Sequence, residues 1–112
     1  MKSVLLFFKT LVTMQVGKAT TFWAHGDAQN PDPHLACLHR DLKDSDLVVA
    51  HKTLPCGSSV VVYNLRTNLA TRAIVGDRGP RHAMVDLSRA VAKAIGSNGK
   101  ETVVLISALT KR

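Results

Sequence analysis

Residues 76–88 read GDRGPRHAMVDLS and place an aspartate near each end of a loop rich in Gly, Pro, Arg and His. Asp77 follows a β-branched run, and Asp86 precedes a segment with a helical pattern. In isolation, Asp77 is typical of a residue that caps a turn and pairs with Arg78, and an acid such as Asp86 is favoured by the helix dipole. The end of a strand and the start of a helix can also bring two carboxyl groups to one mouth of a barrel, with one ionised and the other protonated. The stretch is therefore a candidate site as well as a turn.

The sequence around this loop predicts short strands and one helix. Asn68 suits the left-handed position of a tight turn, which joins two β-branched runs into a hairpin. Ser88 suits a helix N-cap, and Gly96 suits the left-handed position that ends a helix. Residues 25–46 are rich in Asp, Asn, Pro and His without a sustained period, which predicts irregular surface structure. The expected extended runs are 16–24, 47–51, 59–65, 70–75 and 102–109, the last buried on both faces, and the expected helix is 87–96.

The composition predicts one small, mainly β domain. The chain has 112 residues, of which 46% are hydrophobic and only 4% aromatic, so its core would be built from aliphatic side chains. Such residues suit short strands better than long helices. Because closure removes the sheet edges that a short chain cannot cover, we expect a small closed β-barrel.

The charge is positive and diffuse. Fifteen Lys and Arg residues against eight acids give a formal net charge of +7, but no basic run resembles a nucleic-acid tail. A diffuse positive field favours any polyanion, including an acidic cell wall or a membrane surface. Since no nucleic-acid motif accompanies the charge, we expect no specific nucleic-acid partner.

The N-terminal segment 1–16 resembles a weak signal peptide or an N-terminal extension. Lys2 precedes the apolar residues 4–8, but Lys9 interrupts them and leaves the apolar run shorter than usual. The segment is too short and too broken to span a membrane, so no transmembrane anchor is expected. Met14 is an alternative start site.

Two cysteines, Cys37 and Cys56, leave two interpretations open. They form a disulfide in an oxidising compartment, or they are two reduced thiols in the core. The chain has no C-x-x-C motif and no Cys/His ligand spacing, so neither a metal site nor a cofactor is expected.

Other side chains have both structural and functional interpretations. His51 ends an apolar run, where a histidine is usually structural, but it could also transfer a proton at the mouth of the barrel. Trp23 and Tyr63 are either core residues or platforms that stack on a sugar ring. The other histidines lie in expected loops, where we predict them to be solvated.

Four short motifs follow one another along the chain: AHKTLP at 50–55, NL at 64–65, DRGP at 77–80 and DLSRA at 86–90. Together they resemble the double-psi β-barrel domain of the rare lipoprotein A family, over residues 17 to about 109. The resemblance implies a six-stranded double-psi β-barrel with one or two short helices, which would occupy residues 17–112. It also implies a relationship in fold to the expansins and to one class of endoglucanases.

The same resemblance implies a function and an active site. Members of the family act on peptidoglycan as lytic transglycosylases, which cleave the β-1,4 bond between N-acetylmuramic acid and N-acetylglucosamine and leave a 1,6-anhydro product. Carried over by position, Asp77 and His51 are active-site residues. Asp86 matches the aspartate of the expansin D-L-S motif, and Thr20 matches an early groove threonine of the expansins. We therefore expect Asp77, His51 and Asp86 to be catalytic and Thr20 to bind substrate.

One position departs from the pattern of the lytic members, which carry an acidic residue upstream of the histidine. Arg40 occupies that place here, with Asp41 next to it. Either Asp41 takes over the role and contacts substrate, or the position is lost. Loss of the acid favours a non-catalytic, expansin-like module that binds wall polysaccharide, or a structural adaptor barrel.

The remaining expectations concern substrate contacts and location. Arg78 and Arg81 are candidates to hold the N-acetyl or lactyl groups of the glycan. Cys37 and Cys56 resemble a disulfide of many secreted relatives. The expected partner is peptidoglycan or another wall polysaccharide, and the expected state is a monomer. The expected location is the cell envelope or the outside of the cell; a phage-encoded wall-acting protein would need no signal peptide.

Overall fold

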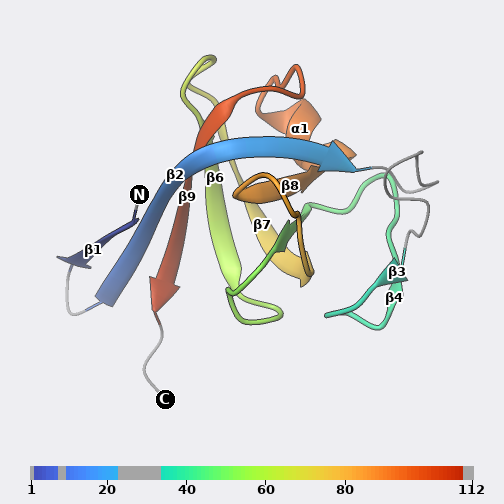
Figure 1. Cartoon of the computed structure of the whole chain (residues 1–112), viewed down its shortest axis with the longest axis horizontal. Helices are drawn as coiled ribbons and strands as arrows, with labels where there is room; N and C mark the ends of the chain where they lie inside the picture. Colours follow the sequence, from blue (N-terminus) through green and yellow to red (C-terminus); the bar gives the residue numbers. More distant parts are fainter. Residues whose placement is uncertain (1, 8–9, 23–33, 110–112) are drawn as a thin grey trace.

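The computed structural model describes residues 2–7, 10–22 and 34–109. These residues form nine strands and one short helix (Figure 1). In chain order the elements are β1 (Lys2–Phe7), β2 (Thr10–Phe22), β3 (His34–Leu35), β4 (Arg40–Asp41), β5 (Val48–His51), β6 (Ser59–Asn64), β7 (Ala70–Asp77), β8 (Val85–Ser88), α1 (Arg89–Ala94) and β9 (Thr102–Leu109). The helix among these described residues is neither long enough nor apolar enough to cross a membrane.

Six of the strands close into a barrel. The sheet order is β1-β2-β8-β5-β7-β6-β9, and an additional pairing between β2 and β9 closes the six strands from β2 to β9 into a ring, with β1 outside it. The long strand β2 makes this closure possible, because Leu11–Lys18 pair with β9 and Ala19–Phe22 pair with β8. In Figure 1, β2 arches over the barrel and β1 lies beside the first part of β2, while β3 and β4 lie to one side of the barrel. The predictions of a mainly β fold and of a closed six-stranded barrel are confirmed.

The hairpin and helix signals are confirmed, with a shorter helix than expected. Asn68 has a φ of 60° in the β6–β7 turn, and Gly96 has a φ of 63° after α1. The Ser88 hydroxyl accepts a hydrogen bond from the Val91 N–H, as expected of an N-cap. Leu87 does not begin the helix, because it pairs with Val49 in the sheet and so extends β8 up to the cap.

Two strands differ from their predictions. β2 begins at Thr10 instead of residue 16, so the barrel extends into the segment assigned to an N-terminal extension. β9 is not buried on both faces: Val103, Leu105 and Ser107 are buried, and the residues between them are only half-buried. Burial alternates along the strand because it pairs with both β2 and β6 and turns only one face into the barrel. The expected irregular segment 25–46 contains the two-residue strands β3 and β4 in its described part.

Two apolar clusters lie on opposite faces of the sheet around β5. Val49 belongs to the inner cluster, which fills the barrel, and its neighbours Val48 and Ala50 belong to the outer one. This division follows from the alternation of side chains along a strand. The outer cluster holds the segment that carries β3 and β4 against the barrel and consists of Phe22, Leu35, Leu42, Val48 and Ala50, with Leu38 packed against it.

A glycine allows this close packing at the end of β7. A Cβ added at Gly76 would lie 2.6 Å from Val48 Cγ1 and 3.3 Å from Leu38 Cδ1. We therefore expect Gly76→Ala to lower the free energy of unfolding by about 1 to 2 kcal/mol through overpacking. Urea denaturation followed by circular dichroism measures the change, with the exposed Arg72→Ala on the same strand as a near-neutral control. Equal midpoints for the two variants would contradict the expectation.

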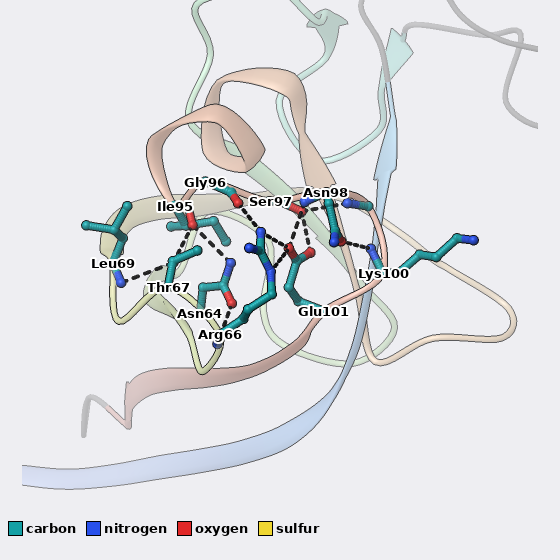
Figure 2. A network of polar contacts seen from close by, with 11 residues as sticks. Asn64, Arg66, Thr67, Leu69, Ile95, Gly96, Ser97, Asn98, Lys100 and Glu101 are labelled. Carbon is teal, nitrogen blue, oxygen red and sulfur yellow. Dashed lines mark hydrogen bonds and ion pairs between the residues drawn. The ribbon is translucent and has the colours of Figure 1, made fainter.

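A buried carboxylate joins the β6–β7 turn to the segment between α1 and β9 (Figure 2). Glu101 is 4% exposed and accepts hydrogen bonds from the Arg66 guanidinium at 2.8 Å, the Ser97 hydroxyl at 2.7 Å and the Asn98 N–H at 2.7 Å. Burial raises the pKa of Glu101, but these donors outweigh it and lower the pKa to about 2. The network fixes two loops of the barrel.

Candidate active site

The register of four neighbouring strands brings two aspartates to one cleft. Thr20 on β2 pairs with Asp86 on β8, Asp86 pairs with Ala50 on β5, and Ala50 pairs with Asp77 on β7. Paired residues of neighbouring strands point to the same face of a sheet, so the four side chains share one side. With a strand spacing of about 4.8 Å, the Cα atoms of the two aspartates lie roughly 10 Å apart. Ala50, whose side chain is small, lies between them and lines the cleft.

The space between the two aspartates is a cleft of about 430 Å³. The loop between β7 and β8 forms one wall, in which Gly79 has a φ of 115° and precedes Pro80 through a cis peptide bond. The lining residues are Thr20, Thr21, Ala50, Asp77, Arg78, Gly79, Pro80, Arg81, His82, Ala83 and Asp86. A cleft of this size accommodates a small ligand or part of a polymer.

Asp77 is held by backbone donors. Its Oδ1 atom accepts hydrogen bonds from the Arg78 N–H at 2.9 Å and from the Ala36 N–H at 3.2 Å. The side chain is half-buried and lies at the end of β7. The Ala36 donor comes from the segment that the outer cluster packs against the barrel, so the orientation of Asp77 depends on that packing.

Asp86 is held from the neighbouring strand. The Thr20 hydroxyl donates a hydrogen bond of 2.8 Å to Asp86 Oδ1. This contact follows directly from the parallel register of β2 and β8. Thr20, Asp77 and Asp86, three of the residues selected from the sequence, therefore line the same cleft.

His51 ends β5 and does not line the cleft, and both of its ring nitrogens form hydrogen bonds. It is 4% exposed, and its Nδ1 atom accepts from the Thr53 N–H at 3.1 Å and the Leu54 N–H at 3.0 Å. An Nδ1 atom that accepts two hydrogen bonds carries no proton, so Nε2 carries it and donates to Gln15 Oε1 at 2.9 Å. The ring is then neutral and shapes the turn after β5. This geometry favours the structural interpretation of His51 over a direct proton transfer.

The barrel agrees with the comparisons to known proteins. No family model matches the chain. The endolytic peptidoglycan transglycosylase RlpA of Pasteurella multocida is 48% identical over 52 residues, which are 45% of this chain and 18% of that protein. A probable endolytic peptidoglycan transglycosylase RlpA of Synechocystis is 43% identical over 63 residues, 53% of this chain and 20% of that protein.

Among solved structures, the Streptomyces papain inhibitor (SPI) has the same fold, with a TM-score of 0.59 and 24% identity over 87% of this chain and 94% of that one. The chain carries an RlpA-like double-psi β-barrel domain. The matched part spans only about a fifth of the RlpA proteins, so their whole length is not represented here.

In this RlpA-like domain, Arg40 stabilises the loop between β4 and β5. Its guanidinium binds the Asp46 carboxylate through two hydrogen bonds of 2.7 and 3.1 Å, and this contact holds the pKa of Asp46 below its usual value. Asp41 points elsewhere: its side chain is 73% exposed and lies 3.5 Å from His34. Neither Arg40 nor Asp41 lines the cleft.

The arginines of the DRGPR stretch differ in their contacts. The Arg78 guanidinium donates to the carbonyls of His51 at 3.0 Å and Leu54 at 2.6 Å, so it holds the turn after β5 although it also lines the cleft. Arg81 is exposed and lines the cleft, and its carbonyl accepts a hydrogen bond from Lys52 Nζ at 3.1 Å. Arg81 is thus better placed than Arg78 to contact a ligand.

Of the two aromatic candidates, the structure describes only Tyr63. Tyr63 lies on β6, where its hydroxyl donates to Asn68 Oδ1 at 2.6 Å, and it does not line the cleft. Trp23 lies outside the described residues, as does His25. The expected solvation of the remaining histidines agrees with the exposure of His34, His39 and His82.

The cysteines of the RlpA-like domain form a disulfide between Cys37 and Cys56, with a Cα–Cα distance of 5.1 Å. The interpretation of two reduced thiols is therefore wrong for this structure.

Three residues of the site were not selected from the sequence. Gln15 acts through its side-chain amide, Ala36 through its backbone N–H, and Ala50 through its small side chain. No residue-type signal marks such positions in a single sequence.

Proposed function

We propose that the domain binds peptidoglycan glycan strands in this cleft and cleaves them as a lytic transglycosylase. The observation that carries the proposal is the placement of Asp77 and Asp86 on either side of Ala50 in one open cleft. The relatives named as endolytic peptidoglycan transglycosylases give the substrate class. Such a substrate places the domain outside the cytoplasm, in the cell envelope or beyond it.

The chemistry requires one carboxyl group that acts twice. Protonated Asp77 donates its proton to the glycosidic oxygen, and the bond between that oxygen and C1 of N-acetylmuramic acid breaks. The resulting carboxylate then takes the proton of the muramyl 6-hydroxyl, whose oxygen forms the new bond to C1 and closes the 1,6-anhydro ring. Water takes no part, so no second carboxylate is needed to activate it.

The hydrogen bonds of Asp77 leave one of its two carboxyl oxygens available for this role. Because Oδ1 already accepts two backbone N–H groups, Oδ2 is the oxygen that carries and returns the proton. The Asp86 carboxylate stabilises the positive charge that develops at C1 as the bond breaks. Arg81 contributes positive charge beside the lactyl group of the muramyl residue.

Thr20 gives a graded test of the Asp86 role. Thr20→Val keeps the shape of the side chain but removes the hydroxyl that donates to Asp86. The hydrogen bond to this charged group is worth about 1.4 kcal/mol. If the transition state loses that stabilisation, the rate of anhydro-product formation falls about tenfold. Liquid chromatography of the released products measures the rate, and an unchanged rate would remove Asp86 and Thr20 from the mechanism.

The second candidate function is a non-catalytic domain that grips wall polysaccharide. The position of Arg40 favours it, because the acid of the lytic members is replaced by a residue that pairs with Asp46, and Asp41 does not line the cleft. Such a domain would keep the cleft, Thr20 and Asp86 for binding but release no product.

Purified sacculi separate the two functions. The protein is incubated with sacculi, bound protein is measured by co-sedimentation, and soluble products are analysed by mass spectrometry. Binding with release of 1,6-anhydromuropeptides supports cleavage, and binding without them supports the non-catalytic domain. Asp41→Asn serves as a matched control, since its exposed carboxylate lies outside the cleft and its loss should leave the product yield unchanged.

A further inference from the structure

The Cys37–Cys56 disulfide connects the two segments that flank Asp77. Cys37 lies in the turn between β3 and β4, and Cys56 lies in the turn between β5 and β6, 19 residues further along the chain. Both segments contact the end of β7, where Asp77 is located. The bond lies outside the inner cluster that fills the barrel.

On one side of the disulfide, two consecutive N–H groups bind the end of β7. The Cys37 N–H donates to the Gly76 carbonyl at 3.0 Å, and the Ala36 N–H donates to Asp77 Oδ1 at 3.2 Å. The position of Cys37 therefore fixes one of the two backbone donors that orient the Asp77 carboxylate.

On the other side, Arg78 binds the turn that carries Cys56. Its guanidinium donates to the Leu54 carbonyl at 2.6 Å and contacts Cys56 Sγ at 3.2 Å. Gly57 follows Cys56 and donates its N–H to the Val75 carbonyl at 2.8 Å. Asp77 thus lies between two segments that the disulfide holds at a fixed separation.

We propose that the Cys37–Cys56 disulfide is a positioning element for Asp77, so that its reduction slows glycan cleavage while the barrel stays folded. The inference rests on the proposed lytic function. A dithiol supplies the two electrons. Its first thiolate attacks one sulfur, which breaks the Cys37–Cys56 bond, releases the other cysteine as a thiolate and forms a mixed disulfide. Its second thiolate then attacks the mixed disulfide, which closes the reductant into a cyclic disulfide and releases the second cysteine; the two cysteine thiolates take up the two protons that the dithiol lost. Cys56 is exposed, which gives the reductant access to the bond.

The test compares the oxidised protein with the same protein reduced by dithiothreitol. We expect reduction to lower kcat for anhydro-product release at least tenfold, with KM and the stoichiometry of sacculus binding within twofold. A general loss of folding would lower the binding stoichiometry in the same proportion as the rate, so this readout separates positioning from stability. Reoxidation should restore the rate, and a Cys37→Ser, Cys56→Ser double variant should be slow and insensitive to dithiothreitol.

Amide hydrogen exchange gives a readout that needs no activity. Reduction should accelerate exchange at the Ala36 amide at least tenfold and leave the amides of the buried barrel residues Val49 and Val103 unchanged. Equal kcat in the two redox states overturns the inference while the proposed function stands. No anhydro product from the oxidised protein overturns the proposed function and the rate effect together, and unchanged exchange at Ala36 overturns the positioning by itself.

Discussion

Asp77→Asn is expected to lower the rate of anhydro-product release by about a thousandfold or more. General acid–base catalysis by one positioned group contributes about 10²–10⁴ in rate, and here one group performs both proton transfers. An amide at this position can neither donate a proton to the glycosidic oxygen nor accept one from the muramyl 6-hydroxyl. Mass spectrometry of products released from sacculi over a long incubation measures the residual rate.

The same variant should retain its fold and its affinity for sacculi. The Asn oxygen can accept the N–H groups of Ala36 and Arg78 as the carboxylate does, so the local hydrogen bonds survive. Circular dichroism and co-sedimentation with sacculi check this. If Asp77→Asn releases product at a rate near that of the wild type, Asp77 is not the acid, and Asp86 becomes the candidate within the same cleft.

Much of this cleft could be predicted from the sequence, because its parts lie at the ends of recognisable elements. Asp77 follows a β-branched strand and Asp86 precedes a capped helix, and strand register then places both beside Ala50. The Ser88 cap and the turns at Asn68 and Gly96 were predictable from local backbone chemistry. Local signals of this kind act within a few residues and do not depend on the rest of the fold.

The predictions that failed concern residues whose positions depend on contacts between segments far apart in the sequence. Sequence reasoning assigned Gln15 to an extension, but β2 continues through it and Gln15 accepts a hydrogen bond from His51, 36 residues away. Asp41 and Tyr63 were plausible substrate contacts by residue type, but their own strands turn them away from the cleft. Residue type indicates what a side chain can do, and only the register decides where it acts.

Glu101→Gln is expected to lower the free energy of unfolding at pH 7 by about 3 kcal/mol. Burial raises the pKa of Glu101, but the Ser97, Asn98 and Arg66 donors outweigh it and lower the pKa from its ordinary value of 4.5 to about 2 in the folded protein. At about 1.4 kcal/mol per pKa unit, this difference stabilises the folded state by roughly 3 kcal/mol when the carboxyl is ionised in both states. Glutamine keeps the shape but removes the charge that Arg66 and the two other donors bind (Figure 2).

The sign of the pKa change also fixes the pH dependence. A depressed folded-state pKa gives stability that is fully present above about pH 4.5 and is lost as the pH falls toward 2. Urea denaturation should therefore show a large difference between wild type and Glu101→Gln at pH 7 and a much smaller one near pH 2.5. Lys100→Ala, an exposed neighbour, should match the wild type at both pH values. A difference that stays constant with pH would mean that Glu101 acts through its shape, and that the charge-assisted network does not hold the β6–β7 turn.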